Sequence, residues 1–402
     1  MRLVVGLIAL TSCYGPTPHP GAPCGEDGAC PAPLICAAAT STCEVDPSTI
    51  PPGDGGPIDT TSDGEMVVPP DAPDLCFGTG LVTTCLDSVP TSKLTVSGAA
   101  TINTSNDASC TKIIGANPAL CVVAATEIDV AGTLRVEGTR PIVLISMTTI
   151  EVGVTGEIDA SSRRTFGAAV GAGADVGCGT GTQAKSDGGG YGGSFSGKGG
   201  DGGDGITEIV GLGDGGVALA AATPPAQLRG GCPGGAGAGS TAGVGGHGGG
   251  GMYLIARTSI TVSGTLNASG AGGSGCTDTC GGGGGGSGGM IGLDAAAIEV
   301  TTAGEVFANG GGGAEGSVSA ASDSGNDPAA AAIAAVGGSG VSSGGGDGGA
   351  GSVSANRNGS AGGGASLTNP PGSGGGGGGG AAGVIKLHGT ATLDGDVSPP
   401  PS

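Results

Sequence analysis

The stretch Met252-Tyr253-Leu254-Ile255, followed by Ile260-Thr261-Val262-Ser263-Gly264-Thr265-Leu266-Asn267-Ala268, contains the pattern that decides the fold. Its first part is continuously apolar, and its second part alternates apolar residues or Gly with polar ones. A period of two indicates a β-strand with one buried face. Gly264 marks a position where the chain is expected to bend tightly.

The same two-part pattern, called a pass below, recurs along the chain, as expected of a repeat architecture. In four passes the first residue of the apolar run and the following Ile are eight positions apart. The runs begin at Leu120, Ile142, Met252 and Met290, and the matching isoleucines are Ile128, Ile150, Ile260 and Ile298. Val384 opens a fifth, degenerate pass, and residues 94–98 look like a partial first one.

Each pass is long enough for one coil with two or three short strands. Stacked coils would align equivalent residues about 4.8 Å apart, so the four isoleucines would form an internal ladder. Glycines would occupy the corners, at Gly132, Gly156, Gly264 and Gly304. We predict an all-β domain over 76–402, a parallel β-helix or solenoid. An antiparallel β-sandwich is the alternative, because some intervals between passes are long enough to contain other strands.

Glycine-rich insertions separate the passes, at 162–250, 271–288 and 311–382. Each leaves a coil at the same point, so all are expected to emerge along one edge. They form either flexible loops or packed extended polyglycine helices whose backbone groups pair. The flexible interpretation is favoured, and it predicts that most of 311–382 can be deleted without unfolding the domain.

The composition excludes several classes of protein. The chain has 96 Gly and 25 Pro in 402 residues, but no regular Gly-x-y repeat, which excludes collagen. It contains no Trp, 4 Phe and 3 Tyr, and thus lacks an aromatic surface for bases or sugar rings. A formal charge of −21 excludes a nucleic-acid partner.

The N-terminus has the layout of an export signal. Arg2 precedes the apolar run Leu3–Leu10, and small residues follow. Leu10-Thr11-Ser12-Cys13 resembles a bacterial lipobox, which implies that residues 1–12 are removed and that Cys13 is acylated, for example with palmitate. In that family, Tyr14 in place of Asp implies sorting to the outer membrane of a Gram-negative cell. The alternative is a buried apolar strand.

The cysteine content agrees with export. Besides Cys13 the chain has an even number of cysteines, which indicates a disulfide framework. Spacing suggests the pairs Cys76–Cys85, Cys110–Cys121 and Cys276–Cys280, and elimination then leaves Cys178–Cys232. The other four cysteines lie close together, at Cys24, Cys30, Cys36 and Cys43. Zinc is the alternative for that group, but no Cys-x-x-Cys occurs and His19 is the only nearby His.

The N-terminal region resembles the small Cys-rich modules of myxobacterial surface lipoproteins. A tether and module over 13–46 would be followed by an acidic, Pro-rich linker over 47–75. Residues 44–75 hold seven Pro and eight Asp or Glu, with no Lys or Arg, and are expected to be extended. The glycine tracts show a weaker similarity to mycobacterial glycine-rich surface proteins.

Few residues in the sequence suggest a catalytic or metal-binding site. Residues 199–207 fit one calcium-binding nonapeptide, with Asp201 and Asp204 as candidate ligands, but that motif normally works in tandem. Five carboxylates on alternating strands are candidates for a glycan-cleaving pair, although solvent-facing positions explain them better: Glu127, Asp129, Glu151, Glu157 and Asp159. His247 and His388 have no acidic or nucleophilic neighbour in sequence.

These observations favour a non-enzymatic lipoprotein of the outer membrane or cell surface, with a structural, adhesive or matrix role. Its expected partners are the membrane, through the lipid, and a surface polysaccharide or protein. No cofactor is expected. The alternatives are a β-helix enzyme acting on polysaccharide and a calcium-stabilised secreted module.

Overall fold

The computed structural model describes residues 24, 29–30, 34–37, 41–45, 75–164, 169–206, 212–221, 225–340, 344–366 and 372–402. The chain divides into two compact units, Met1–Asp71 and Ala72–Ser402. The predicted signal peptide, Cys13 and nearly all of the predicted linker lie outside the described residues. Within the described ranges, one 3-10 turn, η3 (Asp107–Ser109), is the only helical element, and all others are strands. The all-β prediction is therefore confirmed.

The first unit contains a short antiparallel hairpin. Strand β1 (Leu34–Ala37) pairs with β2 (Thr42–Val45), with Cys36 opposite Cys43. Disulfides join Cys24 to Cys36 and Cys30 to Cys43. An isolated two-stranded hairpin is at best marginally stable in water, so the two bridges are the main source of its stability.

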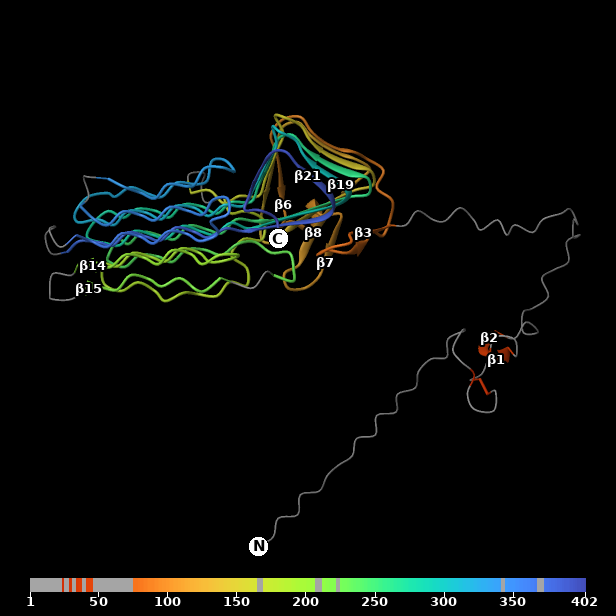
Figure 1. The fold of residues 1–402 in the computed structure, drawn as a ribbon, viewed down its shortest axis with the longest axis horizontal. Helices are drawn as coiled ribbons and strands as arrows, with labels where there is room; N and C mark the ends of the chain where they lie inside the picture. Colours follow the sequence, from red (N-terminus) through yellow and green to blue (C-terminus); the bar gives the residue numbers. More distant parts are fainter. Residues whose placement is uncertain are drawn as a thin grey trace, which may run out of the picture. The chain divides into compact units, whose positions relative to one another are not determined.

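The second unit stacks its passes in three columns of parallel strands (Figure 1). The leading column comprises β8 (Leu120–Ala125), β11 (Ile142–Ser146), β16 (Gly251–Ala256) and the first halves of β19 (Met290–Val300) and β21 (Val384–Leu393). The middle column comprises β5 (Leu94–Val96), β9 (Ile128–Val130), β12 (Thr149–Val152), β17 (Ser259–Val262) and the second halves of β19 and β21. The trailing column comprises β6 (Ala100–Asn103), β10 (Thr133–Glu137), β13 (Glu157–Asp159), β18 (Thr265–Asn267), β20 (Glu305–Phe307) and β22 (Asp396–Ser398).

Three short antiparallel pairs lie beside these columns. They are β7 (Lys112–Ile114) with β8, β3 (Cys76–Phe77) with β4 (Thr84–Cys85), and β14 (Gly205–Ile206) with β15 (Leu212–Gly213). The pairing within the large sheets is otherwise parallel, unlike that of the antiparallel sandwich considered as the alternative.

The predicted isoleucine ladder is confirmed. Ile150 pairs with Ile128 on one side and with Ile260 on the other, and Ile260 pairs with Ile298. All four are at most 2% exposed and belong to one apolar core between the columns. The corner glycines stack as well, because a Cβ on Gly264 would lie 2.2 Å from the Gly156 carbonyl oxygen. Side chains larger than hydrogen are therefore excluded from this corner.

The leading strands are buried on both faces. Cys121 and Ile142 face the inner core, whereas Val122 and Val143 face a second core on the outside of the sheet. Phe77, Val82 and Leu86, from the segment before the first pass, belong to this second core together with Phe195 and Leu228. This double burial explains why the leading strands read as continuous apolar runs rather than alternating ones.

The predicted register of the leading strands is wrong in two passes. Ile142 pairs with Cys121 instead of Leu120, and Met252 pairs with Ile291 instead of Met290. A shift by one residue normally moves apolar side chains to the solvent face. Here both faces are covered by apolar groups, so the hydrophobic pattern carries no information on the register.

The flexible interpretation of the glycine insertions is also wrong. Their extended segments run side by side away from the sheets as one bundle, with β14 and β15 towards its far end (Figure 1). The N–H groups of Gly281 and Gly284 donate to segment 235–238, those of Gly282 and Gly285 to 375–378, and those of Gly283 and Gly286 to 271–274. The carbonyls of the same segment accept from 190–193, 243–249 and 311–314.

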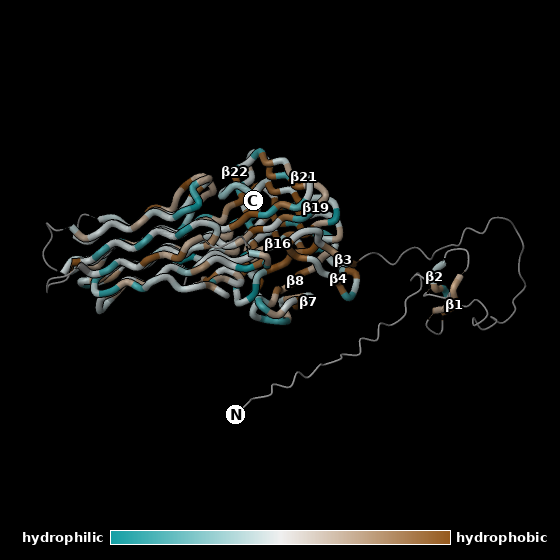
Figure 2. Tube along the Cα trace, turned by 60° about the horizontal axis from the view of Figure 1, so that its bottom comes forward, coloured by the Kyte–Doolittle hydropathy of each residue, from teal (hydrophilic) through white to brown (hydrophobic). Residues whose placement is uncertain are grey.

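Segment 281–289 therefore has six hydrogen-bonded neighbours, and each neighbour is contacted at every third residue. A period of three is that of a polyproline II helix, whose backbone groups point outward in three directions. Neighbouring segments replace the water that normally solvates such a helix. In a hydropathy view the bundle is mostly pale, with scattered teal and brown residues, whereas apolar residues gather in the stacked sheets (Figure 2). We call this array the glycine bundle.

The glycine bundle begins where trailing strands end, so the prediction that the insertions emerge along one edge is confirmed. Asp159, at the end of β13, accepts from the Ser161 N–H, and Asn267, at the end of β18, accepts from the Ser269 N–H. β13 and β18 are neighbours in the same sheet. Equivalent side-chain turns thus direct successive insertions into the bundle.

The ladder predicts a sharp difference between neighbouring positions. Ile260→Asp would place an unpaired charge in the core and is expected to abolish cooperative folding. Thr261 lies on the other face between Glu151 and Glu299, so Thr261→Lys is expected to change the free energy of unfolding by about 0.5 kcal/mol or less. Denaturant unfolding followed by circular dichroism measures both. Equal damage from the two substitutions would contradict the assigned faces.

The glycine bundle predicts that added methyl groups are not tolerated in its interior. A Cβ on Gly284 would lie 1.9 Å from the Tyr191 carbonyl oxygen, so Gly284→Ala is expected to destabilise the unit by roughly 3 kcal/mol or more. At Gly364 the nearest atom would be 3.7 Å away, and Gly364→Ala is the matched control, with an expected effect within about 1 kcal/mol.

Equal unfolding midpoints for the two alanine variants would mean that the bundle is not packed. Deleting most of 311–382, which the sequence suggested would be tolerated, is now expected to disrupt the bundle, because 375–378 contacts its central segment.

Candidate functional site

A cavity of about 690 Å³ opens on the outside of the leading column. Its walls come from the β3–β4 hairpin, the end of β16 and the middle of β19 and β21. The β19–β21 register shifts between Asp294 and Ala297, and the cavity lies at this irregularity. The volume is within the range of small-molecule sites.

Asp294 is buried at one wall of the cavity, with 3% of its surface exposed. Its carboxylate accepts hydrogen bonds from the Thr79 N–H (2.7 Å), the Thr79 hydroxyl (2.9 Å), the Gly80 N–H (3.0 Å) and the Tyr253 hydroxyl (3.2 Å). Burial, and next the nearby Asp294 charge, raise the pKa of Tyr253. With four donors already bound, Asp294 anchors the segment around Thr79 to the sheet and is not free to act as a base.

His388 leaves one polar atom without a partner. Its ring packs against Gly80, where a Cβ would lie 2.2 Å from the ring. Among the described residues, no hydrogen-bond partner reaches its buried Nε2 atom. The ring centroid is 6.4 Å from that of Tyr253. The His388 side chain lines the cavity, although its unpaired Nε2 atom is itself buried.

Arg257 is an exposed cation at the same cavity. Its guanidinium carbon lies 4.7 Å from the centre of the Phe77 ring, a cation–π contact. Most Lys and Arg side chains in the described ranges are ion-paired, including Lys93, Lys112 and Lys198. No such pair involves Arg257 within the part of the chain that the structure describes.

The candidate carboxylates separate into two groups. Asp129 and Glu151 are partners on the outside of the middle column, near the Lys93–Glu127 ion pair of 2.6 Å. A hydrogen bond from Lys93 to Glu127, and then their charge attraction, raise the pKa of Lys93. These three acids are accounted for by ordinary surface positions on a sheet.

The solvent-facing assignment of Asp159 is wrong. Its side chain is 4% exposed, and it pairs with Arg135 at 2.9 Å and with Arg163 at 2.8 Å. Arg163 also pairs with Glu157, whose pKa is raised by burial and next by the Asp159 charge. The start of the first glycine insertion covers this part of the sheet, which alternation within one strand could not reveal. Two arginines thus engage the acids that a glycan-cleaving pair would need free.

Asp201 and Asp204 are both bound by protein donors. Asp201 pairs with Lys198 at 2.7 Å and accepts from the Ala218 N–H, and Asp204 accepts from the Gly215 N–H. The motif continues into the antiparallel β14–β15 hairpin instead of parallel turns. These contacts use the two carboxylates structurally, and we do not propose calcium binding there.

His247 has an acidic partner that the sequence did not indicate. Its Nδ1 atom lies 2.6 Å from Asp175, which also accepts from the Gly248 N–H. This hydrogen bond is the main cause of the raised pKa of His247. No nucleophilic side chain contacts the ring among the described residues, so the pair is structural in geometry. The partners are 72 residues apart, which explains why local inspection missed them.

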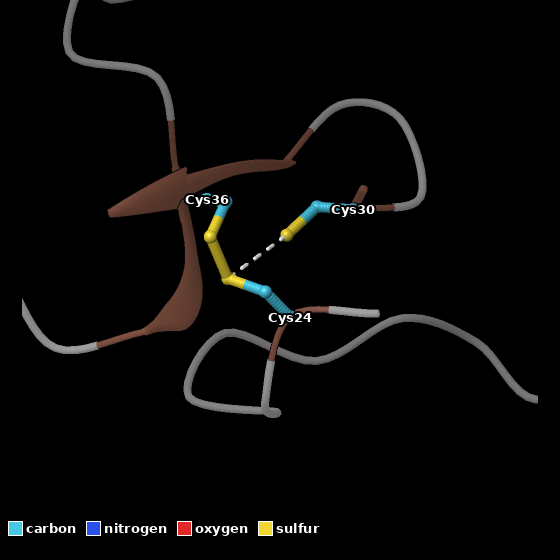
Figure 3. Close-up of side chains that lie close together, drawn as sticks. All are labelled: Cys24, Cys30 and Cys36. Carbon is cyan, nitrogen blue, oxygen red and sulfur yellow. Dashed lines mark hydrogen bonds between the residues drawn. A yellow bond between two sulfur atoms is a disulfide. The ribbon is translucent and has the colours of Figure 1, made fainter. Parts of the chain in front are cut away.

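Six disulfides are present in the described part of the chain. Besides the two of the first unit, they join Cys76–Cys85, Cys110–Cys121, Cys178–Cys232 and Cys276–Cys280, the four pairs expected from the sequence. In the first unit, Cys24, Cys30 and Cys36 have sulfur atoms within 4.8 Å of one another (Figure 3). Each belongs to a disulfide, so none is the thiolate that a zinc site needs.

Comparison with protein-family models, with curated proteins and with solved structures found no match. Within the described residues, no helix has the length and apolar character required to span a bilayer.

The His247–Asp175 pair predicts a pH dependence of stability. Because the pKa of His247 is raised in the folded state, the pair stabilises fully below the ordinary value of 6.5. That contribution is lost as the pH rises through the folded-state pKa. Guanidinium unfolding midpoints measured from pH 5 to 9 should fall more for the wild type than for Asp175→Asn. An identical pH profile for the two proteins would show that the pair is not formed.

Proposed function

We propose that this chain is a non-enzymatic lipoprotein of the outer membrane or cell surface, with a structural, adhesive or matrix role. In this proposal, Cys13 carries the lipid, the Cys-rich module and the acidic linker follow, and the Ala72–Ser402 unit is displayed beyond them. The disulfides are consistent with an oxidising compartment. The resemblance to myxobacterial surface lipoproteins belongs to the same proposal.

We further propose that the Ala72–Ser402 unit is a parallel β-helix with the glycine bundle as a lateral projection. The support is the parallel pairing of successive passes in all three columns, with one inner core. Apart from the partial first pass, each pass contributes a strand, or half of a long strand, to each of the three columns. Between them, the columns enclose the ladder isoleucines.

The single observation that carries the functional proposal is the glycine bundle. Its interior consists of backbone hydrogen bonds with almost no side chains, so it offers rigidity and little chemistry. A large part of the chain forms this bundle, which suits a spacer or scaffold. The alternative of a polysaccharide-cleaving enzyme is weaker, because Asp159 is held by two arginines.

Blocking lipidation tests the location. Cys13→Ala, or treatment of cells with globomycin, is expected to leave an uncleaved or released form without a fatty-acid label. Metabolic labelling with an alkyne palmitate, followed by membrane fractionation, measures this. The matched control is Ser12→Ala, which keeps a small residue before the cysteine. A wild-type chain that remains in the cytosol without label would overturn the proposal.

A further inference from the structure

We propose that the cavity beside Arg257 binds a carboxylate-bearing sugar, of mono- to disaccharide size. This inference goes beyond surface location and structural role, because it assigns a ligand to a defined site. The site consists of Arg257 on Phe77, the hydroxyls of Thr83 and Thr84, and His388.

Arg257 supplies the recognition of the carboxylate. Among the described residues, five Lys or Arg side chains make no ion pair, and three of these, Arg164, Arg229 and Arg357, donate to backbone carbonyls instead. The Arg257 guanidinium has neither kind of partner in these ranges. Stacking on the buried Phe77 ring holds the flat guanidinium in place and leaves its N–H edges free. A planar fork of donors matches a carboxylate through two parallel hydrogen bonds.

The remaining walls favour a ligand rich in hydroxyls. Thr83 and Thr84 line the cavity, and their hydroxyls have no protein partner among the described residues. The His388 side chain belongs to the same lining, but its partnerless Nε2 atom is itself buried and is not part of the proposed contacts. A purely apolar ligand would leave the two threonine hydroxyls without partners, whereas sugar hydroxyls both donate and accept. The cavity volume of about 690 Å³ accommodates one or two sugar rings.

Binding is tested on the full-length protein with glucuronate as the probe. Isothermal titration is expected to detect glucuronate binding at low salt, with much weaker binding of methyl glucoside, which lacks the carboxylate, and of acetate, which lacks the hydroxyls. Arg257→Gln is expected to weaken glucuronate binding by roughly tenfold or more, as for loss of a charged hydrogen bond. Thr83→Val should cause a smaller loss.

Lys185→Gln is the matched control. It removes the same charge from an exposed position on the glycine bundle and should leave glucuronate binding unchanged. Circular dichroism establishes that each variant is folded. The proposal is overturned if glucuronate does not bind at millimolar concentration, if Arg257→Gln binds it as the wild type does, or if acetate or methyl glucoside binds equally well. None of these results bears on lipidation at Cys13, so the two proposals fail independently.

Discussion

A buried peptide group must be hydrogen-bonded, and the Ala72–Ser402 unit meets this requirement in two different ways. In the sheets, each pass pairs in parallel with the passes before and after it. In the glycine bundle, each central segment bonds to several neighbours at intervals of three residues. The two systems share one chain, because each insertion leaves the end of one pass and returns at the start of the next. The parallel pairing of successive passes therefore brings the glycine segments together.

The glycine bundle has an unusual energetic basis. Glycine loses more conformational entropy on folding than any other residue, and it buries no side chain in compensation. Close backbone contact and complete hydrogen bonding have to offset that cost. A few larger groups assist: a Cβ on Gly235 would lie 2.6 Å from the Tyr191 ring, which shows how closely the ring packs on the backbone. The Cys178–Cys232 bridge, with a sequence separation of 54, adds about 4 kcal/mol by restricting the unfolded chain.

Most Lys and Arg side chains in the described ranges form ion pairs within the structure. Arg135 and Arg163 neutralise Asp159 where the glycine bundle meets the sheet, and Lys198 holds Asp201 within the bundle. Arg257 differs from these residues, because within the described ranges its guanidinium has neither an ion pair nor a hydrogen bond, and it lies beside a cavity. A ligand carrying a negative charge would complete the pattern, and it would do so on the face that the β3–β4 hairpin partly covers.

The sequence by itself determined the all-β class, the isoleucine ladder around Ile260, the corner at Gly264 and three disulfide pairs of the second unit, because each depends on local alternation or spacing. The fourth pair, Cys178–Cys232, followed from these three by elimination. Only the tertiary structure decided the register of the leading strands, since apolar residues on both faces make either register equally plausible. It also decided the order of the glycine segments, whose hydrogen-bond partners are supplied by other segments. The contacts of Asp294 with Thr79 and of His247 with Asp175 join residues 215 and 72 positions apart. Such contacts leave no periodic signal in a single sequence, because they arise only when separate passes stack.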